Sequence, residues 1–390
     1  MNLWTWHIFS NNRYKKPKYN HHIYTTTSSN NRFLHRIPYS AFLNPRLKIL
    51  SNGIEVFNNA MDSKTATIDL SFNTKNEELE FHFSGFDIVR TVVDLDFREK
   101  ELTYLDISIF KDVTRLLCSK NKLRTLHLGS GNKLTDLHCS ENELTELNIS
   151  EQIRLEQITY FNNKLSTLDT SKNSGLTTIH CASNKHSSLD LSKNLKLKSI
   201  ICYDNQLSSL DISKNNDLVQ IYCSNNSIEV LNVASNEKLE TFLCSKNKLT
   251  QLDVTKNSGL KLLNFSDNSI TDIDITKNPE LTYLTLFRNN VKVLNTSLNP
   301  KLDHLLCAYN QITLLDVSKN VALKTFYCNN NQLSYLNINN SNNDNLEFFR
   351  ADLNPNLNCI QVDDETLSPP KGANWRKDGK ATYSKYCNLL

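Results

Sequence analysis

Eight of the ten cysteines in this chain fall on a lattice with a period of 21 residues. They stand at positions 118, 139, 181, 202, 223, 244, 307 and 328, and the vacant points of the lattice hold Phe97, Tyr160, Phe265 and Leu286. Asparagine follows three residues after eleven of these twelve points, with Lys100 as the exception. A fixed period of this length is the signature of a repeat architecture, so most of the chain has to fold as stacked copies of one small unit.

Twelve repeats follow from this lattice, beginning at Val92 and then every 21 residues to Leu323, with the consensus L-x-x-L-x-C-x-x-N-x-L-x-x-L-D-L-S-x-N-x-x. The segment L-x-x-L-x-C places alternating apolar side chains on one face of a short strand. The asparagine that follows can turn inward and bond to the main chain of the neighbouring coil. One repeat cannot bury its apolar face alone, so the coils stack around a continuous core.

The second half of the repeat, L-x-x-L-D-L-x-x-N, copies the first half. Because both halves have the pattern of a strand followed by an asparagine turn, we expect two parallel β-sheets. The predicted fold is therefore an all-β-rich solenoid of about twelve coils, weakly curved and capped at both ends. One repeat departs at its eleventh position, where His186 replaces the usual Leu, Ile or Val.

This repeat resembles the leucine-rich repeat family, in particular the 21-residue LxxLxCxxNxLxxLDLxxN type of surface and secreted, internalin-like proteins of Bacteroidetes. The segment from Leu176 to Leu197, LTTIHCASNKHSSLDLSKNLKL, carries the resemblance well. Residues 339–364, Asn374-Trp375 and Cys387 are similar to the terminal cap of those proteins. The resemblance covers about residues 92–387 and implies an exported or surface-attached binding protein.

The two cysteines off the lattice, Cys359 and Cys387, both lie in the expected cap. We expect a disulfide between them if the protein resides in an oxidising compartment. The lattice cysteines point inward with the leucines, and we interpret them as small buried apolar residues.

Four regions are predicted along the chain: a basic leader or extension over 1–60, N-terminal cap strands over 61–91, twelve repeats over 92–343, and a degenerate repeat with a cap over 344–390. Residues 1–50 carry eight Lys or Arg and no Asp or Glu. A disordered segment is the first interpretation of this head. An organellar transit peptide, or a start codon upstream of a product that begins near Met61, are the alternatives.

Composition excludes several classes of function. The net charge of +3 argues against a nucleic-acid binder. No apolar run is long enough to span a bilayer, so we expect no membrane insertion. The chain contains no GxSxG, HExxH, P-loop or GxGxxG motif. It also has no CxxC pair, and His138 and His180 stand two coils apart. We therefore predict a protein that is not an enzyme, with no cofactor and no metal site.

The fifteenth position of the repeat is a column of Asp and Asn, interrupted by His127. Stacked carboxylates repel one another unless they are compensated. Lysines three positions later, among them Lys172, Lys193 and Lys214, offer that compensation. A solvated, charge-balanced ladder is the first interpretation, and calcium held between coils is the alternative.

The outward positions of the L-x-C face are apolar and aromatic in the second half of the array. We predict a ligand-binding face made by these residues: Tyr203, Tyr222, Leu243, Leu262, Tyr283, Phe287, Leu306, Tyr309 and Tyr327. An exposed patch in which tyrosine is prominent is typical of recognition sites.

The sequence thus predicts a scaffold for protein–protein recognition, secreted or at a cell surface, with a protein as the first partner. A carbohydrate-binding or adhesion module that uses the same aromatic strip is the alternative, and a structural spacer is a third interpretation. A cytoplasmic location is the alternative to export.

Overall fold

The computed structural model describes the backbone of residues 32–34, 46–51, 54–60, 67–69 and 79–84, and then residues 94–387 except for 109, 132, 367, 368 and 371. The first group forms two small antiparallel sheets. Their strands are β1 (Arg32–Leu34) with β4 (Thr67–Asp69), and β2 (Arg46–Ser51) between β3 (Ile54–Ala60) and β5 (Leu79–Ser84). Most of the predicted leader lies outside the described residues.

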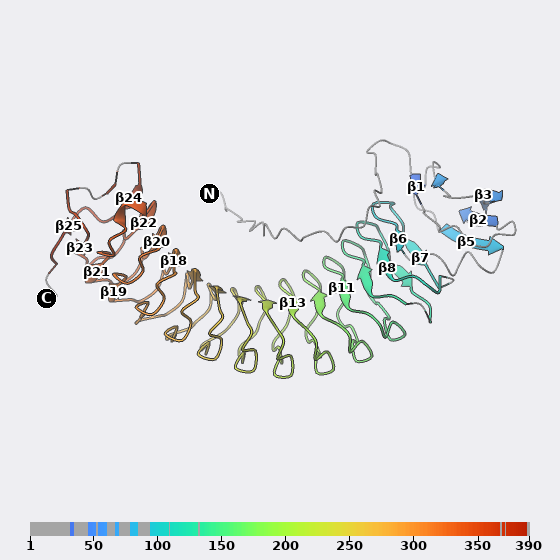
Figure 1. The fold of residues 1–390 in the computed structure, drawn as a ribbon, viewed down its shortest axis with the longest axis horizontal. Coiled ribbons are helices and arrows are strands. Elements are labelled where there is room, and N and C mark those ends of the chain that lie inside the picture. Colours follow the sequence, from blue (N-terminus) through green and yellow to red (C-terminus); the bar gives the residue numbers. More distant parts are fainter. Residues whose placement is uncertain are drawn as a thin grey trace.

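The solenoid is built on one 14-stranded parallel sheet, and Figure 1 shows its coils following an arc with this sheet along the inner side. Each of the twelve repeats contributes one strand, and the C-terminal cap adds two more. In chain order the strands are β6 (Asp94–Asp96), β8 (Arg115–Leu117), β10 (Asp136–His138), β11 (Gln157–Thr159), β12 (Thr178–His180), β13 (Ser199–Ile201), β14 (Gln220–Tyr222), β15 (Thr241–Leu243), β16 (Leu262–Asn264), β17 (Tyr283–Thr285), β18 (His304–Leu306), β20 (Thr325–Tyr327), β22 (Phe348–Arg350) and β24 (Asn374–Arg376).

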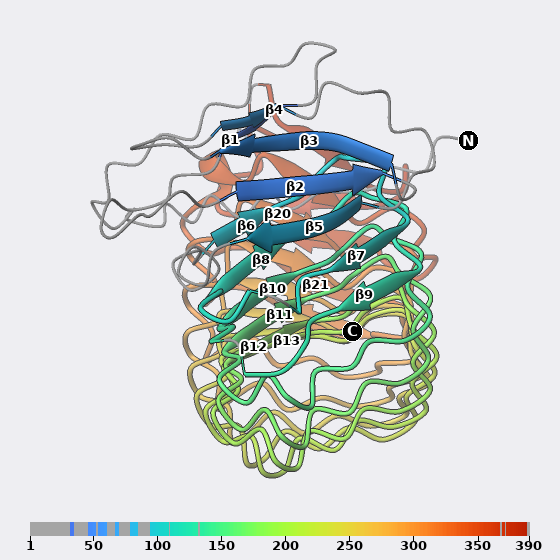
Figure 2. The same ribbon diagram turned by 90° about the vertical axis from the view of Figure 1, so that its right-hand side faces the viewer.

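The second sheet is present only towards the two ends of the array. The strands on that side are β7 (Tyr104–Asp106) and β9 (Thr125–His127), then β19 (Leu314–Asp316), β21 (Tyr335–Asn337), β23 (Cys359–Gln361) and β25 (Thr382–Ser384). Figure 2, which looks onto the N-terminal end, shows β7 and β9 across the coil from β6 and β8. The only described helix is the 3-10 turn η1 (Asn343–Asn345).

The curvature of the array accounts for the discontinuous outer sheet, whereas the local turns do not. The turn after the L-D-L segment has the same bond in coils with and without an outer strand: the Asn173 N–H donates to the Thr170 carbonyl at 2.9 Å in a middle coil, and the Asn320 N–H donates to the Val317 carbonyl at 3.0 Å in the coil of β19. In an arc the outer segments lie further apart than the inner strands, so the ladder spacing of about 4.8 Å is kept on the inner side.

The asparagine ladder predicted at the ninth position is confirmed by its hydrogen bonds. The Asn142 amide donates to the carbonyls of Cys139 and Cys118, both at 3.0 Å, and its oxygen accepts the Leu123 N–H at 3.0 Å. The same three bonds recur from coil to coil, for example at Asn289 and Asn310. Each side chain therefore ties its own turn to the coil before it.

The core is continuous along the whole array. The buried leucines, isoleucines and valines of the described coils belong to one cluster, together with the eight lattice cysteines, which are all fully buried. The fold is thus the predicted all-β solenoid of stacked 21-residue coils. The described part of the chain contains no helix with the length and apolar character that crossing a membrane requires.

Candidate functional site: the inner face of the solenoid

The strands of the inner sheet have one buried residue between two that face outward. In β14, for example, Ile221 is fully buried while Gln220 and Tyr222 are partly exposed. Because neighbouring strands are parallel and in register, the outward residues form columns along the inner face. A side chain at one of these positions can therefore touch its counterpart in the next coil.

The predicted binding residues lie on this face in two settings. Six of them are outward residues of the strands β14 to β18 and β20: Tyr222, Leu243, Leu262, Tyr283, Leu306 and Tyr327. The register pairs Tyr222 with Leu243, Leu262 with Tyr283, and Leu306 with Tyr327. The remaining three, Tyr203, Phe287 and Tyr309, lie in the turns that follow the strands.

A first aromatic cluster lies near the C-terminal end of the face. Tyr283 stacks on His304 with ring centroids 5.3 Å apart, and Phe287 meets Tyr309 edge-on at 4.9 Å. The Arg288 guanidinium lies over both Phe287 and Tyr309, at 4.9 and 5.4 Å from their centroids. We call Tyr283, Phe287, Arg288, His304 and Tyr309 the C-terminal cluster.

A second aromatic cluster lies four coils earlier. Phe161 stacks on His180 at 4.6 Å, and His180 lies 6.3 Å from Tyr203. Burial lowers the pKa of His180 to about 4. We call these three residues the N-terminal cluster.

The predicted binding face contains only part of each cluster. Phe161, His180, Arg288 and His304 are not in it, because the prediction took only apolar and aromatic residues of the second half of the array. The sequence does carry a signal for these pairs, because each ring stands 19 to 23 positions from its partner in the next coil.

The surface between the clusters is small and polar. Ser224, Ser245 and Ser266 occupy the repeat position that holds Tyr203 before them and Phe287 after them. The Ser245 hydroxyl donates to that of Ser224 at 3.0 Å, and Ser266 bonds to Thr285 at 2.9 Å. The row of aromatic residues is therefore interrupted along this column, while the outward strand residues Leu243 and Leu262 keep the surface between the clusters partly apolar.

The Asp and Asn column is bonded to the turns that follow it. The Asp169 carboxylate accepts the N–H of Ser171 at 2.8 Å, and Asp274 accepts the hydroxyl and the N–H of Thr276 at 2.7 and 2.9 Å. These hydrogen bonds hold the pKa of both carboxyls below the usual value, and the charges of Lys172 and Lys277 act in the same direction. The described residues contain no group of three or more His, Cys, Asp or Glu arranged to hold a metal ion.

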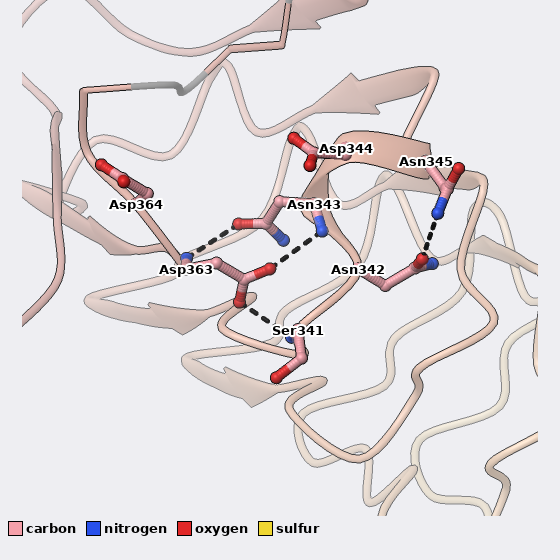
Figure 3. Close-up of a pocket in the computed structure, with 7 residues that line it drawn as sticks. All are labelled: Ser341, Asn342, Asn343, Asp344, Asn345, Asp363 and Asp364. Atoms are coloured by element: carbon pink, nitrogen blue, oxygen red, sulfur yellow. Dashed lines mark hydrogen bonds between the residues drawn. The ribbon is translucent and has the colours of Figure 1, made fainter.

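A small polar cavity lies near η1, and Figure 3 shows the side chains that line it. Its centre is Asp363, whose carboxylate accepts the N–H groups of Ser341 and Asn343, each at 2.9 Å. The Asp363 N–H in turn donates to the Asn343 side chain at 2.9 Å. These bonds satisfy the turn where the regular repeat ends, so we assign the cavity a structural role.

Neither cysteine chemistry nor a thiol ligand set is available on the surface. Burial raises the pKa of all eight lattice thiols, for example that of Cys139 to about 12, so they stay protonated. In the cap, Cys359 and Cys387 are joined by a disulfide.

Comparisons with known proteins agree with this architecture. No family model matches the sequence, and no curated protein matches it. Among solved structures, the functional domain of InlJ from Listeria monocytogenes, which includes a cysteine ladder, is 26% identical with a TM-score of 0.61. That match covers 82% of this chain and 66% of the InlJ domain, just under two thirds of its length.

Two further structures show the same fold at lower identity. The internalin InlF from Listeria monocytogenes is 20% identical with a TM-score of 0.61, over 79% of this chain and 91% of that one. YopM, a leucine-rich effector protein from Yersinia pestis, is 20% identical with a TM-score of 0.53, over 73% and 88%. The chain therefore has the fold of a leucine-rich repeat protein, and among these proteins it resembles the internalins.

Proposed function

We propose that this protein is a non-enzymatic scaffold for protein–protein recognition, secreted or displayed at a cell surface, and that it binds its partner with the inner face. The observation that carries the proposal is the gathering of Tyr, Phe, Leu and Arg side chains on one continuous sheet. Aromatic residues and arginine dominate binding energy at protein interfaces. The other surfaces of the middle coils carry mainly Asp, Lys, Ser and Thr.

Two further features support this proposal. The polar groups of the Asp column and of the η1 cavity are engaged in turns, and the lattice thiols are buried. Neither set leaves groups arranged for catalysis. The Cys359–Cys387 disulfide favours an oxidising compartment and so an exported protein.

Photo-crosslinking tests which face binds. A photoreactive phenylalanine analogue is placed at position 283 or 327 on the inner face, and at position 230 on the outer face as the control, since Val230 is 66% exposed. Each protein is exposed to surface proteins of the cells that produce it. We expect the same protein adduct from positions 283 and 327 and none from position 230.

Substitution provides the second arm of this test. The triple variant Tyr222→Ser, Tyr283→Ser, Tyr327→Ser should weaken binding of the captured protein at least tenfold, because each substitution removes an interface ring. The matched variant Val230→Ser, Val293→Ser, Leu314→Ser removes exposed apolar residues of the outer side and should bind normally. Equal adducts from all positions would contradict the proposal. Binding to a glycan array without any protein adduct would replace it with the carbohydrate-binding alternative.

A further inference from the structure

One stretch of the core departs from the regular pattern of the solenoid. Apart from asparagine amides, the buried polar side-chain atoms of the described residues that lack a hydrogen-bond partner belong to Ser140, Tyr160, His180 and His186. All four lie in the three consecutive coils of residues 134–196. The other described coils hold apolar side chains at the sites that correspond to Tyr160 and His186.

His186 is the centre of this stretch. Its side chain is fully buried at a position that is apolar in the other coils, and neither ring nitrogen has a hydrogen-bond partner. It packs edge-on against Tyr160 with centroids 5.7 Å apart. Tyr160, also fully buried, occupies a cysteine point of the lattice, and its hydroxyl has no partner either.

His180 is a second ionisable group in the same coil. It is an outward, partly exposed residue of β12, but its Nε2 is buried without a partner and its ring lies between Phe161 and Tyr203. The neighbouring strands place Thr159 and Ile201 beside it. Tyr160, Phe161, Tyr203, Thr159 and Ile201 carry no carboxylate, so these neighbours offer neither histidine a negative charge that would favour its protonated form. For both rings burial is the leading cause of a lowered pKa, and at His186 it outweighs an interaction with the Ser166 backbone that acts in the opposite direction.

We infer that residues 134–196 form an acid-sensitive segment, in which protonation of His180 and His186 opens the coils locally while the coils on either side stay folded. The fully buried ring of His186, and that of His180 with its enclosed Nε2, resist protonation in the closed coils, whereas the same rings in an opened coil take up a proton freely. Acid therefore stabilises the open form. Because His180 belongs to the N-terminal cluster, opening would also dismantle part of the inner face.

The direction and the pH range follow from the linkage of protonation to folding. Above the ordinary histidine pKa of 6.5 both forms are neutral and pH has no effect. As the pH falls below 6.5, the open form binds protons that the closed form does not, so closure weakens. With a pKa of about 4 in the closed form, His180 alone favours opening by roughly 30-fold between pH 7.0 and pH 4.8. His186 adds to this in the same direction.

Hydrogen exchange of the full chain, followed by mass spectrometry at pH 7.0 and pH 4.8 and corrected for intrinsic exchange rates, tests this inference. We expect amide protection in residues 134–196 to fall by at least tenfold at pH 4.8, and protection in residues 218–338 to change less than threefold. His186→Leu restores the apolar residue of the other coils, and with His180→Phe it should abolish most of the loss. His304→Phe is the control, because His304 is paired with Asp303 at 2.7 Å outside the segment.

Three results would overturn the inference. They are unchanged protection of residues 134–196 at pH 4.8, an equal loss in all coils, or a loss that persists in the double variant His180→Phe, His186→Leu. The wild-type comparison alone decides the first two, so the test does not depend on the variants folding.

Discussion

At the scale of single residues, a second asparagine ladder shows how the coil core accommodates polar groups. The Asn278 amide donates to the carbonyls of Val254 and Asn257, at 2.9 and 2.8 Å, but its buried oxygen has no partner. At two of these positions the oxygen is satisfied: Asn320 accepts the Thr296 hydroxyl at 2.6 Å, and Asn194 accepts that of Thr170 at 2.7 Å. The residue 24 positions earlier decides whether the asparagine oxygen has a partner: it is Thr at these two positions and Val254 at Asn278.

This rule predicts opposite outcomes for two nearly isosteric substitutions. Thr296→Val leaves the Asn320 oxygen buried and unpaired, so we expect the free energy of unfolding to fall by about 1–3 kcal/mol. Val254→Thr brings a hydroxyl to the Asn278 oxygen, so we expect a change below about 1 kcal/mol despite the added polar group. Urea denaturation followed by circular dichroism measures both. Equal destabilisation by the two substitutions would show that the hydroxyl bond contributes nothing.

The turn after the inner strand could be predicted from the sequence only in part. The ninth-position asparagine and its bonds could be predicted, because a buried amide after a strand has few other partners. The backbone conformation of the eighth position could not be predicted. In all twelve repeats it is left-handed, with φ between 52° and 59°, yet it holds Glu, Lys, Asn, Ser, Asp, Arg and Tyr and never glycine. A left-handed conformation strains the backbone of any residue other than glycine. This strain is tolerated because the hydrogen bonds of the ladder asparagines fix the turn.

At the scale of elements, the sequence period predicts the inner sheet because one strand per 21 residues has to pair with its copies. It does not predict that the outer sheet breaks. The two halves of the repeat look alike as patterns of apolar residues, but the array is an arc, so the second halves lie further apart than the first halves and the ladder spacing is kept on the inner side. Ion pairs between coils still follow the register on that side, as between Lys238 and Asp217 or Lys301 and Glu280.

The last elements of the chain depend on the disulfide. Cys359 begins β23 and Cys387 follows β25, so the bond closes a loop with a sequence separation of 28 around the final strand pair. By loop-closure entropy we expect Cys387→Ser to lower the stability of the cap by about 3–4 kcal/mol. Faster hydrogen exchange confined to residues 359–387 measures the effect. Reductant should reproduce it in the wild type and leave the variant unchanged, whereas a reductant-insensitive wild type would contradict the prediction.

At the scale of the whole molecule, the solenoid is nearly one-dimensional, since each coil contacts only the coils before and after it. The two aromatic clusters are therefore held apart by a count of coils rather than by any direct contact. Tyr203 and Phe287 stand at the same repeat position four coils apart, which corresponds to roughly 19 Å at the strand spacing of a sheet. Changing that count changes the distance without changing either cluster.

Deletion of residues 239–259 removes one complete coil and joins Lys238 to Leu260 in the same repeat phase. We expect this variant to fold, because every remaining coil keeps two neighbours of the kind it had, and to lose only the stability of one coil and one interface. Deletion of residues 239–249 is the control. It removes β15 but leaves the outer half of its coil, so the stack is broken and the array should unfold in part. Circular dichroism and urea denaturation distinguish the two.

The same deletion separates the two ways in which the inner face could recognise a partner. The whole-coil deletion moves the N-terminal and C-terminal clusters closer by about 5 Å and removes Leu243 and Ser245 from the surface between them, so Leu243→Ser in the full-length chain is the control for the lost leucine. If one rigid protein contacts both clusters at once, the folded variant should bind it at least tenfold more weakly than the wild type, because the two contacts can no longer be made together. Undiminished binding by the folded variant would restrict the interface to a single cluster, and the triple tyrosine variant would then have to be divided between the clusters to find which one binds.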